Sequence, residues 1–125
     1  MNNKKTSKKT LVIGASENPS RYANKAIHRL LKNDHEVVAI GKKTGKVSEV
    51  EILTGLPELK DIDTVTLYIN PTVQKEYESY IISLNPKRII FNPGTENPAF
   101  IQRARKEGIL TKIACTLVML SIDNY

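Results

Sequence analysis

The hydrophobic residues of this chain gather in five short, continuous runs. The runs cover residues 10–14, 36–41, 64–69, 88–92 and 109–115, and glycine, asparagine or cysteine ends or follows each of them. Strands of a parallel sheet are covered on both faces, so they read as continuous apolar runs rather than as an alternation of apolar and polar residues. We therefore predict five buried strands at these positions.

Three of the segments between these runs carry apolar residues at helical spacing. Thr72 and Asn97 are candidate N-caps of the second and third helices, Pro98 fits a first helical position, and Gly108 is a typical helix-ending residue. The apolar stripes comprise Ala23, Ala26, Ile27, Leu30 and Leu31, then Val73, Tyr77, Tyr80, Ile81 and Leu84, and finally Phe100, Ile101 and Ala104.

The segment 42–63 has the weakest pattern, and in it we predict only a loop at 42–46 and a short helix from Pro57 to Ile62. Strands alternate with helices along the rest of the chain, which indicates right-handed βαβ units. The expected fold is a single Rossmann-like three-layer α/β domain over residues 10–125, with a five-stranded parallel sheet and helices on both faces. Ligands of such sheets bind beyond the carboxyl ends of the strands, where the strand order reverses.

The composition fits one soluble domain and excludes several classes of protein. The chain has 125 residues, of which 40% are hydrophobic and 26% charged. It has no apolar run of the roughly 20 residues that a membrane span requires, and no apolar segment follows its basic start, so we expect a cytoplasmic protein without membrane contact. With one cysteine and two histidines, neither a disulfide nor a metal site is expected.

The positive charge is concentrated at the amino end. The formal net charge is +6, and Lys4, Lys5, Lys8 and Lys9 carry four of the positive charges. Residues 1–9 are therefore expected to form a disordered, solvated basic tail. A nucleic-acid contact by this tail is the alternative, but the chain has no tryptophan and no aromatic–basic repeat to support it, so we expect no nucleic-acid partner.

The loop after the first strand has features of a phosphate-binding loop. Gly14 allows a sharp turn, Ala15 and Ser16 are small enough for main-chain N–H groups to approach a phosphate, and the following helix offers its positive end to an anion. Only the first glycine of the pattern G-x-G-x-x-G is present, so a tight turn without a ligand is the alternative. Arg21 can add a charge-assisted contact. The candidate binding residues here are Gly14, Ala15, Ser16, Asn18, Pro19, Arg21 and Tyr22.

The loop after the second strand distinguishes between nucleotides. NAD-binding domains place a carboxylate at this position to hold the ribose 2′-hydroxyl. Here Gly41 is followed by Lys42 and Lys43, and no carboxylate occurs between Val37 and Val47. Lysines attract a phosphorylated ribose, so this loop favours coenzyme A or NADP over NAD. Two solvated surface lysines are the alternative interpretation.

Two Asn-Pro pairs follow the third and fourth strands at the same edge of the predicted sheet. The prolines stiffen the exits from the sheet, a glycine allows close approach of the main chain, and the asparagines can hydrogen-bond ligand hydroxyls or phosphates. Ordinary turn residues are the alternative interpretation. The candidate binding residues are Asn70, Pro71, Asn92, Pro93 and Gly94.

No set of catalytic residues is expected. Cys115 ends the last strand at this edge, but His28 lies within the first helix and His35 precedes the second strand, so neither is placed to act as its base. A buried structural thiol is the favoured role, and a mixed disulfide with a ligand thiol is the alternative. Glu17 is interpreted as a turn residue and Glu96 as a favourable charge before a helix.

These motifs together resemble the stand-alone CoA-binding domain proteins. Members are small bacterial Rossmann proteins, similar in fold to the CoA-binding domain of the succinyl-CoA synthetase α chain. The resemblance spans about residues 10–120 and rests on three motifs. They are Gly14-Ala15-Ser16-x-Asn18-Pro19-Ser20-Arg21 after the first strand, Asn92-Pro93-Gly94 before the last helix, and Cys115 at the end of the last strand.

The resemblance implies binding of coenzyme A or an acyl-CoA. It places the pyrophosphate on the loop after the first strand, Lys42 or Lys43 near the adenosine phosphates, and the segment Ile69–Pro71 along the border of the ligand. Many members have an Asn-Pro pair after the second strand, where this chain has Gly41-Lys42. The phosphohistidine of the synthetase belongs to a separate domain outside the resemblance, so ligase activity is not implied.

The leading hypothesis is a non-catalytic module that binds coenzyme A or an acyl-CoA. A small NADP-dependent oxidoreductase is the alternative, because such an enzyme has the same fold and also uses lysines to bind a ribose phosphate. Against it, the chain lacks the second and third glycines of G-x-G-x-x-G and a Tyr–Lys pair at a fitting site. A regulatory domain whose ligand site has decayed is a third hypothesis. A homodimer and an unknown protein partner both remain open.

Overall fold

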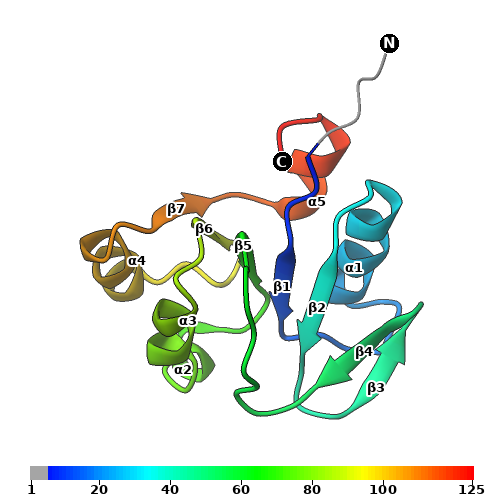
Figure 1. The fold of residues 1–125 in the computed structure, drawn as a ribbon, viewed down its shortest axis with the longest axis horizontal. Coiled ribbons are helices and arrows are strands. Elements are labelled where there is room, and N and C mark those ends of the chain that lie inside the picture. Colours follow the sequence, from blue (N-terminus) through cyan, green and yellow to red (C-terminus); the bar gives the residue numbers. More distant parts are fainter. Residues whose placement is uncertain (1–5) are drawn as a thin grey trace.

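A seven-stranded sheet runs through the centre of the protein, with helices on both of its faces (Figure 1). The computed structural model describes residues 6–125. Within this range the strands are β1 (Thr10–Ile13), β2 (Val37–Ile40), β3 (Gly45–Val47), β4 (Val50–Leu53), β5 (Thr64–Leu67), β6 (Arg88–Phe91) and β7 (Leu110–Ile113). Their order is β3-β4-β2-β1-β5-β6-β7, and all neighbours are parallel except β3 and β4, which form an antiparallel hairpin.

The α/β class and the parallel arrangement of the five expected strands are confirmed, but the predicted number of strands is wrong. The burial expected of the fifth strand is also wrong, because β7 lies at the edge of the sheet and only its Thr111 is buried. The two additional strands, β3 and β4, lie in the segment 42–63. β3 has only three residues, and β4 alternates between buried and exposed side chains, so neither strand contains a continuous apolar run. The helix expected from Pro57 to Ile62 is also wrong, because these residues are irregular and Ile62 is instead buried in the core.

The helices are α1 (Tyr22–Lys32), α2 (Pro71–Gln74), α3 (Glu78–Leu84), α4 (Pro98–Lys106) and α5 (Thr116–Ser121). The single helix expected over the second apolar stripe is divided into α2 and α3, and α5 has no counterpart in the prediction. The cap at Asn97 is confirmed, because its side chain accepts a main-chain N–H of α4 at 3.2 Å. The cap of α2 is Asn70 rather than Thr72.

Two hydrophobic layers hold the helices against the sheet. Because successive side chains of a strand point to opposite faces, Leu11 and Ile13 of β1 belong to one layer and Val12 to the other. The first layer includes side chains of α3 and α4, and the second includes side chains of α1 and α5. The sheet therefore lies between two helical layers, and the loops at its carboxyl edge extend from a rigid core.

Part of the expected basic tail contacts the amino edge of the sheet. The main-chain N–H of Lys8 donates to Nδ1 of His35 at 3.0 Å, and the Lys8 ammonium group donates to the main-chain oxygen of Tyr125 at 2.6 Å. The ammonium group of Lys9 donates to a main-chain oxygen of the segment before β5 at 2.8 Å. The prediction for residues 1–5 lies outside the described residues.

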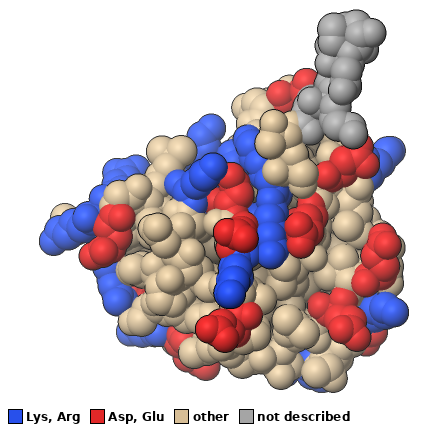
Figure 2. All heavy atoms as spheres, viewed as in Figure 1, with Lys and Arg blue, Asp and Glu red and all other residues tan. Residues whose placement is uncertain are grey.

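The surface carries charges of both signs. On the face shown in Figure 2, basic and acidic side chains are interspersed among uncharged ones. Within residues 6–125, no helix is long and apolar enough to cross a membrane. The same residues contain no group of three or more His, Cys, Asp or Glu side chains that could hold a metal ion.

Candidate functional site

The strand order reverses at β1. The chain first builds the sheet outward from β1 through β2 and β4, and then returns to the other side of β1 and continues through β5, β6 and β7. Open parallel sheets bind their ligands beyond the carboxyl ends of the strands at such a switch point. The loops after β1 and β5 flank this point, so their geometry decides what the site can bind.

The loops after β1 and β5 touch each other at Gly14. Its φ of +102° is a conformation that residues with a Cβ rarely adopt. A Cβ at this position would lie 2.8 Å from the main-chain oxygen of Tyr68 and 3.1 Å from Cγ2 of Ile69. Glycine is therefore required here both for the turn and for the close approach of the two loops.

Hydrogen bonds inside the first loop, residues 14–21, fix its conformation. The N–H groups of Gly14 and Ala15 both donate to the main-chain oxygen of Ile40 at 2.9 Å, so these two groups are already bound within the protein. The side chain of Asn18 accepts the N–H of Ser20 at 3.0 Å and its hydroxyl at 2.8 Å. The loop is thus preorganised without a ligand.

The N-terminus of α1 is the clearest anion-binding feature at this edge. Its N-cap residue, Arg21, makes no side-chain hydrogen bond to the helix, and the first turn has no acidic residue. The first N–H groups of a helix lack partners within it and form the positive end of its dipole. In the same loop, the N–H groups of Ser16 and Glu17 make no hydrogen bond within the part of the chain that the structure describes.

A buried asparagine that the sequence analysis did not single out supports the first loop. Asn24 lies on the buried face of α1, and its Nδ2 donates to the main-chain oxygen of Ser16 at 2.9 Å. A polar residue between Ala23 and Ala26, inside the apolar stripe, is the sequence signal that could have identified it. Through this hydrogen bond, Asn24 fixes the position of the first loop relative to α1, the helix that follows the loop.

The loop after β2 lies against the first loop. A Cβ on Gly41 would lie only 2.4 Å from the main-chain oxygen of Ala15, so the two chain segments are in direct contact. Lys42 and Lys43 follow at once and are exposed. Neither lysine has a hydrogen bond or ion pair with the described residues. Two exposed lysines therefore follow directly after the point where the two loops touch.

The two Asn-Pro pairs are placed differently. Asn70 is exposed and caps α2, where its side chain accepts a main-chain N–H at 2.9 Å. Asn92 is 1% exposed; its amide donates to Thr66 Oγ1 at 2.7 Å and to the main-chain oxygen of Leu67 at 2.8 Å. Its Oδ1 accepts the N–H of Thr116 at 2.9 Å. The Asn92 side chain thus joins β5, β6 and α5, and both of its N–H groups are used inside the protein.

A buried glutamine connects the loops after β5 and β6. Nε2 of Gln74 donates to the main-chain oxygens of Ile69 at 2.9 Å and Thr95 at 2.8 Å, and its Oε1 accepts Nδ2 of Asn97 at 2.9 Å. Gln74 is fully buried. No sequence pattern singled it out, because it falls outside the apolar stripe of its helix. Through this side chain the segment Ile69–Pro71 and the turn at Pro93 are held as one unit.

The turn after β6 is open to solvent. Pro93 and Gly94 are exposed, and Gly94 has a φ of +92° with no atom within 4 Å of the position that a Cβ would take. The N–H of Gly94 donates to the carboxylate of Glu96 at 2.8 Å. Glu96 therefore stabilises this turn directly, in addition to lying before α4.

The titratable groups near the switch point do not form an acid–base pair. Cys115 is half-buried at the N-cap of α5 and makes no capping hydrogen bond. Burial, and to a smaller extent the nearby Cys115, raises the pKa of Tyr68, so its phenol stays protonated. His28 lies on the exposed face of α1 and His35 at the opposite edge of the sheet, so neither histidine lies beside Cys115.

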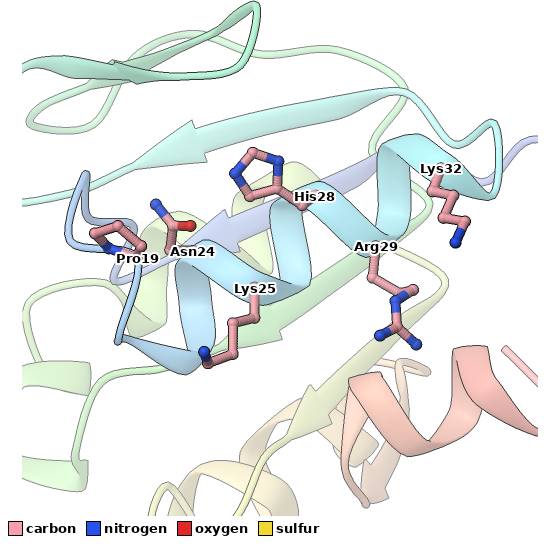
Figure 3. Close-up of a pocket in the computed structure, with 6 residues that line it drawn as sticks. All are labelled: Pro19, Asn24, Lys25, His28, Arg29 and Lys32. Atoms are coloured by element: carbon pink, nitrogen blue, oxygen red, sulfur yellow. The ribbon is translucent and has the colours of Figure 1, made fainter.

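A shallow hollow of about 340 Å³ lies along one side of α1 (Figure 3). Pro19 and Asn24 lie at its loop end, and exposed basic side chains follow along the helix as far as Lys32. The hollow adjoins the first loop at Pro19 but does not include the loops after the other strands. Its lining residues are Pro19, Asn24, Lys25, His28, Arg29 and Lys32.

The strand order and the loops at the carboxyl edge are those of a Rossmann-type α/β domain. The sequence matches a family model described as a CoA binding domain over residues 8–121. The chain belongs to this family, as its motifs indicated. No curated protein matches it.

Solved structures share the whole fold. A crystal structure of an uncharacterized protein is 45% identical, with a TM-score of 0.94 over 97% of this chain and 100% of that one. A hypothetical protein from Pyrococcus horikoshii OT3 is 25% identical, with a TM-score of 0.83 over 93% and 83% of the two chains. The structure of cell-free ID.343 from Thermus thermophilus is 20% identical, with a TM-score of 0.83 over 95% of this chain and 91% of that one. The last of these similarities concerns the fold alone.

Proposed function

We propose that this protein binds coenzyme A or an acyl-CoA at the carboxyl edge of its sheet and acts as a non-catalytic binding module. The observation that carries the proposal is the N-terminus of α1, which has no side-chain cap and directly follows the first loop. In that loop the N–H groups of Ser16 and Glu17 make no hydrogen bond to any described residue. A pyrophosphate suits this set of donors. Membership in the CoA-binding domain family supports coenzyme A as the molecule that supplies it.

The proposed ligand extends from the first loop in two directions. Its pyrophosphate lies over the first loop, where the exposed guanidinium of Arg21 adds positive charge. The adenosine end runs toward β2, where Lys42 and Lys43 attract the ribose 3′-phosphate. The segment Ile69–Pro71 borders the ligand on the side of β5, because the contact between Gly14 and Tyr68 brings that segment to the switch point.

Among residues 6–125, no acid–base pair lies near Cys115, which supports binding without catalysis. A thiol becomes a nucleophile when a base or a positive charge stabilises its thiolate. The neighbouring phenol of Tyr68 stays protonated, and both histidines lie elsewhere in the fold. Cys115 is therefore assigned a structural role in the proposal.

Calorimetric titration of the protein with coenzyme A tests the proposal. We expect a Kd in the micromolar range or tighter, which corresponds to about −8 kcal/mol or better. NAD⁺ and NADP⁺ serve as controls, and NAD⁺ is expected not to bind, because the loop after β2 offers lysines where a ribose hydroxyl would need a carboxylate. Binding of NADP⁺ without binding of coenzyme A would contradict the proposal and favour an oxidoreductase.

The double substitution Lys42→Ala/Lys43→Ala is expected to weaken coenzyme A binding about tenfold, because each lysine supplies charge to the 3′-phosphate. Binding of dephospho-CoA, which lacks this phosphate, is expected to change less than about twofold. Titration of both ligands measures the difference. Arg29→Ala/Lys32→Ala in the last turn of α1 is the matched control, since it removes the same charge away from the edge. An equal loss for both ligands would refute the role of the two lysines.

A further inference from the structure

We infer that Glu17 is a positioning residue that sets where Lys42 and Lys43 stand relative to the bound nucleotide. The inference rests on the proposed function and concerns the selectivity of the same site. A carboxylate in a phosphate-binding loop needs an explanation, because it repels the ligand that the loop attracts. The surroundings of Glu17 supply one.

The Glu17 side chain crosses from the first loop to the β3–β4 hairpin. Its Oε2 accepts the main-chain N–H of Lys46 at 2.8 Å. A Cβ on Gly45 would lie 2.5 Å from Cδ and 2.8 Å from Oε1 of Glu17, so the carboxylate group lies directly against the main chain of β3. The hydrogen bond also partly offsets the negative charge, because the acceptor is an ionised group and the donor is a peptide N–H.

The segment that carries the two lysines is consequently fastened to the first loop at both ends. At its start, Gly41 lies against the main-chain oxygen of Ala15. At its end, Lys46 is bound by Glu17. Only the exposed residues 42–44 and the half-buried Gly45 lie between the two points. Both points of attachment belong to the first loop. The loop that receives the pyrophosphate therefore also fixes the position of the lysine segment relative to the pyrophosphate.

Such a connection matters for one part of the ligand only. The 3′-phosphate of coenzyme A needs charge at a defined distance from the pyrophosphate, and a charge held in place binds better than one on a mobile loop. Dephospho-CoA carries the same pyrophosphate and lacks the 3′-phosphate. The ratio of the two affinities therefore reports on the position of the lysine segment, and a general loss of stability does not alter it.

Glu17→Ala is expected to reduce the preference for coenzyme A over dephospho-CoA about fivefold, since the lysine segment loses its second attachment. Glu17→Gln keeps an oxygen that accepts the Lys46 N–H and is expected to hold the preference within about twofold of the wild type. If the carboxylate acted only through its charge, both substitutions would change the affinities alike, and that result would overturn the inference. Titration of both ligands with each variant measures the ratios.

Gly45→Ala tests the same contact from the other side. The added Cβ displaces the carboxylate from the N–H of Lys46, so the preference is expected to fall as it does in Glu17→Ala. Adding Gly45→Ala to Glu17→Ala should produce no further fall, because the interaction is already lost. Full additivity would count against the inference.

The wild-type titrations separate failure of this inference from failure of the proposed function. A wild type that binds coenzyme A while Glu17→Ala leaves the preference unchanged overturns the positioning role and leaves the proposed function intact. A wild type that binds both ligands equally has the same consequence, because no preference exists for Glu17 to set. A wild type that does not bind coenzyme A overturns both.

Discussion

Replacing Gly14 with alanine is expected to lower the free energy of unfolding by about 3 kcal/mol or more and to abolish binding of coenzyme A. The φ of +102° is strained for any residue with a Cβ, and the new atom would lie 2.8 Å from the main-chain oxygen of Tyr68. The main chain of Tyr68 cannot move aside as a flexible side chain can. The loops after β1 and β5 must therefore separate to relieve the clash. Their separation opens the switch point at which the ligand is proposed to bind.

Gly55→Ala is the matched control for this prediction. Gly55 also has a positive φ, +74°, but nothing lies within 4 Å of the position of its Cβ. Alanine there costs only the conformational strain, about 1 kcal/mol, and binding of coenzyme A is expected to be unchanged. Urea denaturation and calorimetry of both variants measure the contrast. Equal destabilisation of the two would mean that strain alone acts at Gly14 and that the loops are not held in contact.

The sequence predicted the parts of the fold that depend on continuous burial. The five expected strands are β1, β2, β5, β6 and β7. The first four have apolar runs because helices cover both faces of the sheet there. β7 lies at the edge of the sheet, where Leu110 and Ile113 are exposed, so its apolar run does not reflect burial. The hairpin of β3 and β4 lies at the edge of the sheet, where one strand has three residues and the other alternates. A three-residue strand and an alternating strand lack the continuous apolar run on which the prediction depended.

The break between α2 and α3 has a similar explanation. Hydrophobic spacing continues through both helices, so it predicts one helix, but spacing alone does not specify main-chain hydrogen bonds. In the structure Gln74 turns inward at the end of α2 and binds the loops after β5 and β6. A buried polar side chain with partners far along the chain is a tertiary feature, and residue patterns within one helix do not contain it.

The positions of the loops that form the candidate site were predictable, but the partners of their side chains were not. Parallel strands bring their carboxyl ends to one edge, so the loops could be assigned to that edge from strand positions alone. Which groups face a ligand depends on side-chain partners. The N–H groups of Gly14 and Ala15 donate to the main-chain oxygen of Ile40, and the side chain of Asn92 is buried. The side chain of Glu17 binds the β3–β4 hairpin, which was not predicted from the sequence.

The two asparagines of the Asn-Pro pairs are expected to lose different amounts of stability on alanine substitution. Asn92→Ala removes three hydrogen bonds of a buried side chain and leaves the N–H of Thr116 and the hydroxyl of Thr66 with fewer partners. Unsatisfied buried polar groups cost about 1–3 kcal/mol each, so we expect Asn92→Ala to lower the free energy of unfolding by about 3 kcal/mol. Asn70→Ala removes one exposed cap and should cost about 1 kcal/mol.

Denaturation and coenzyme A titration of these two variants measure both effects. If Asn92 has a structural role, Asn92→Ala lowers stability strongly, and any loss of affinity follows from displacement of α5 and the adjoining loops. Asn92→Ala with nearly native stability and a large loss of affinity would instead show direct contact with the ligand. Asn70 lies at the same edge of the sheet, and its side chain is exposed. Because the segment Ile69–Pro71 is proposed to border the nucleotide, we expect Asn70→Ala to reduce the affinity for coenzyme A more than it reduces stability.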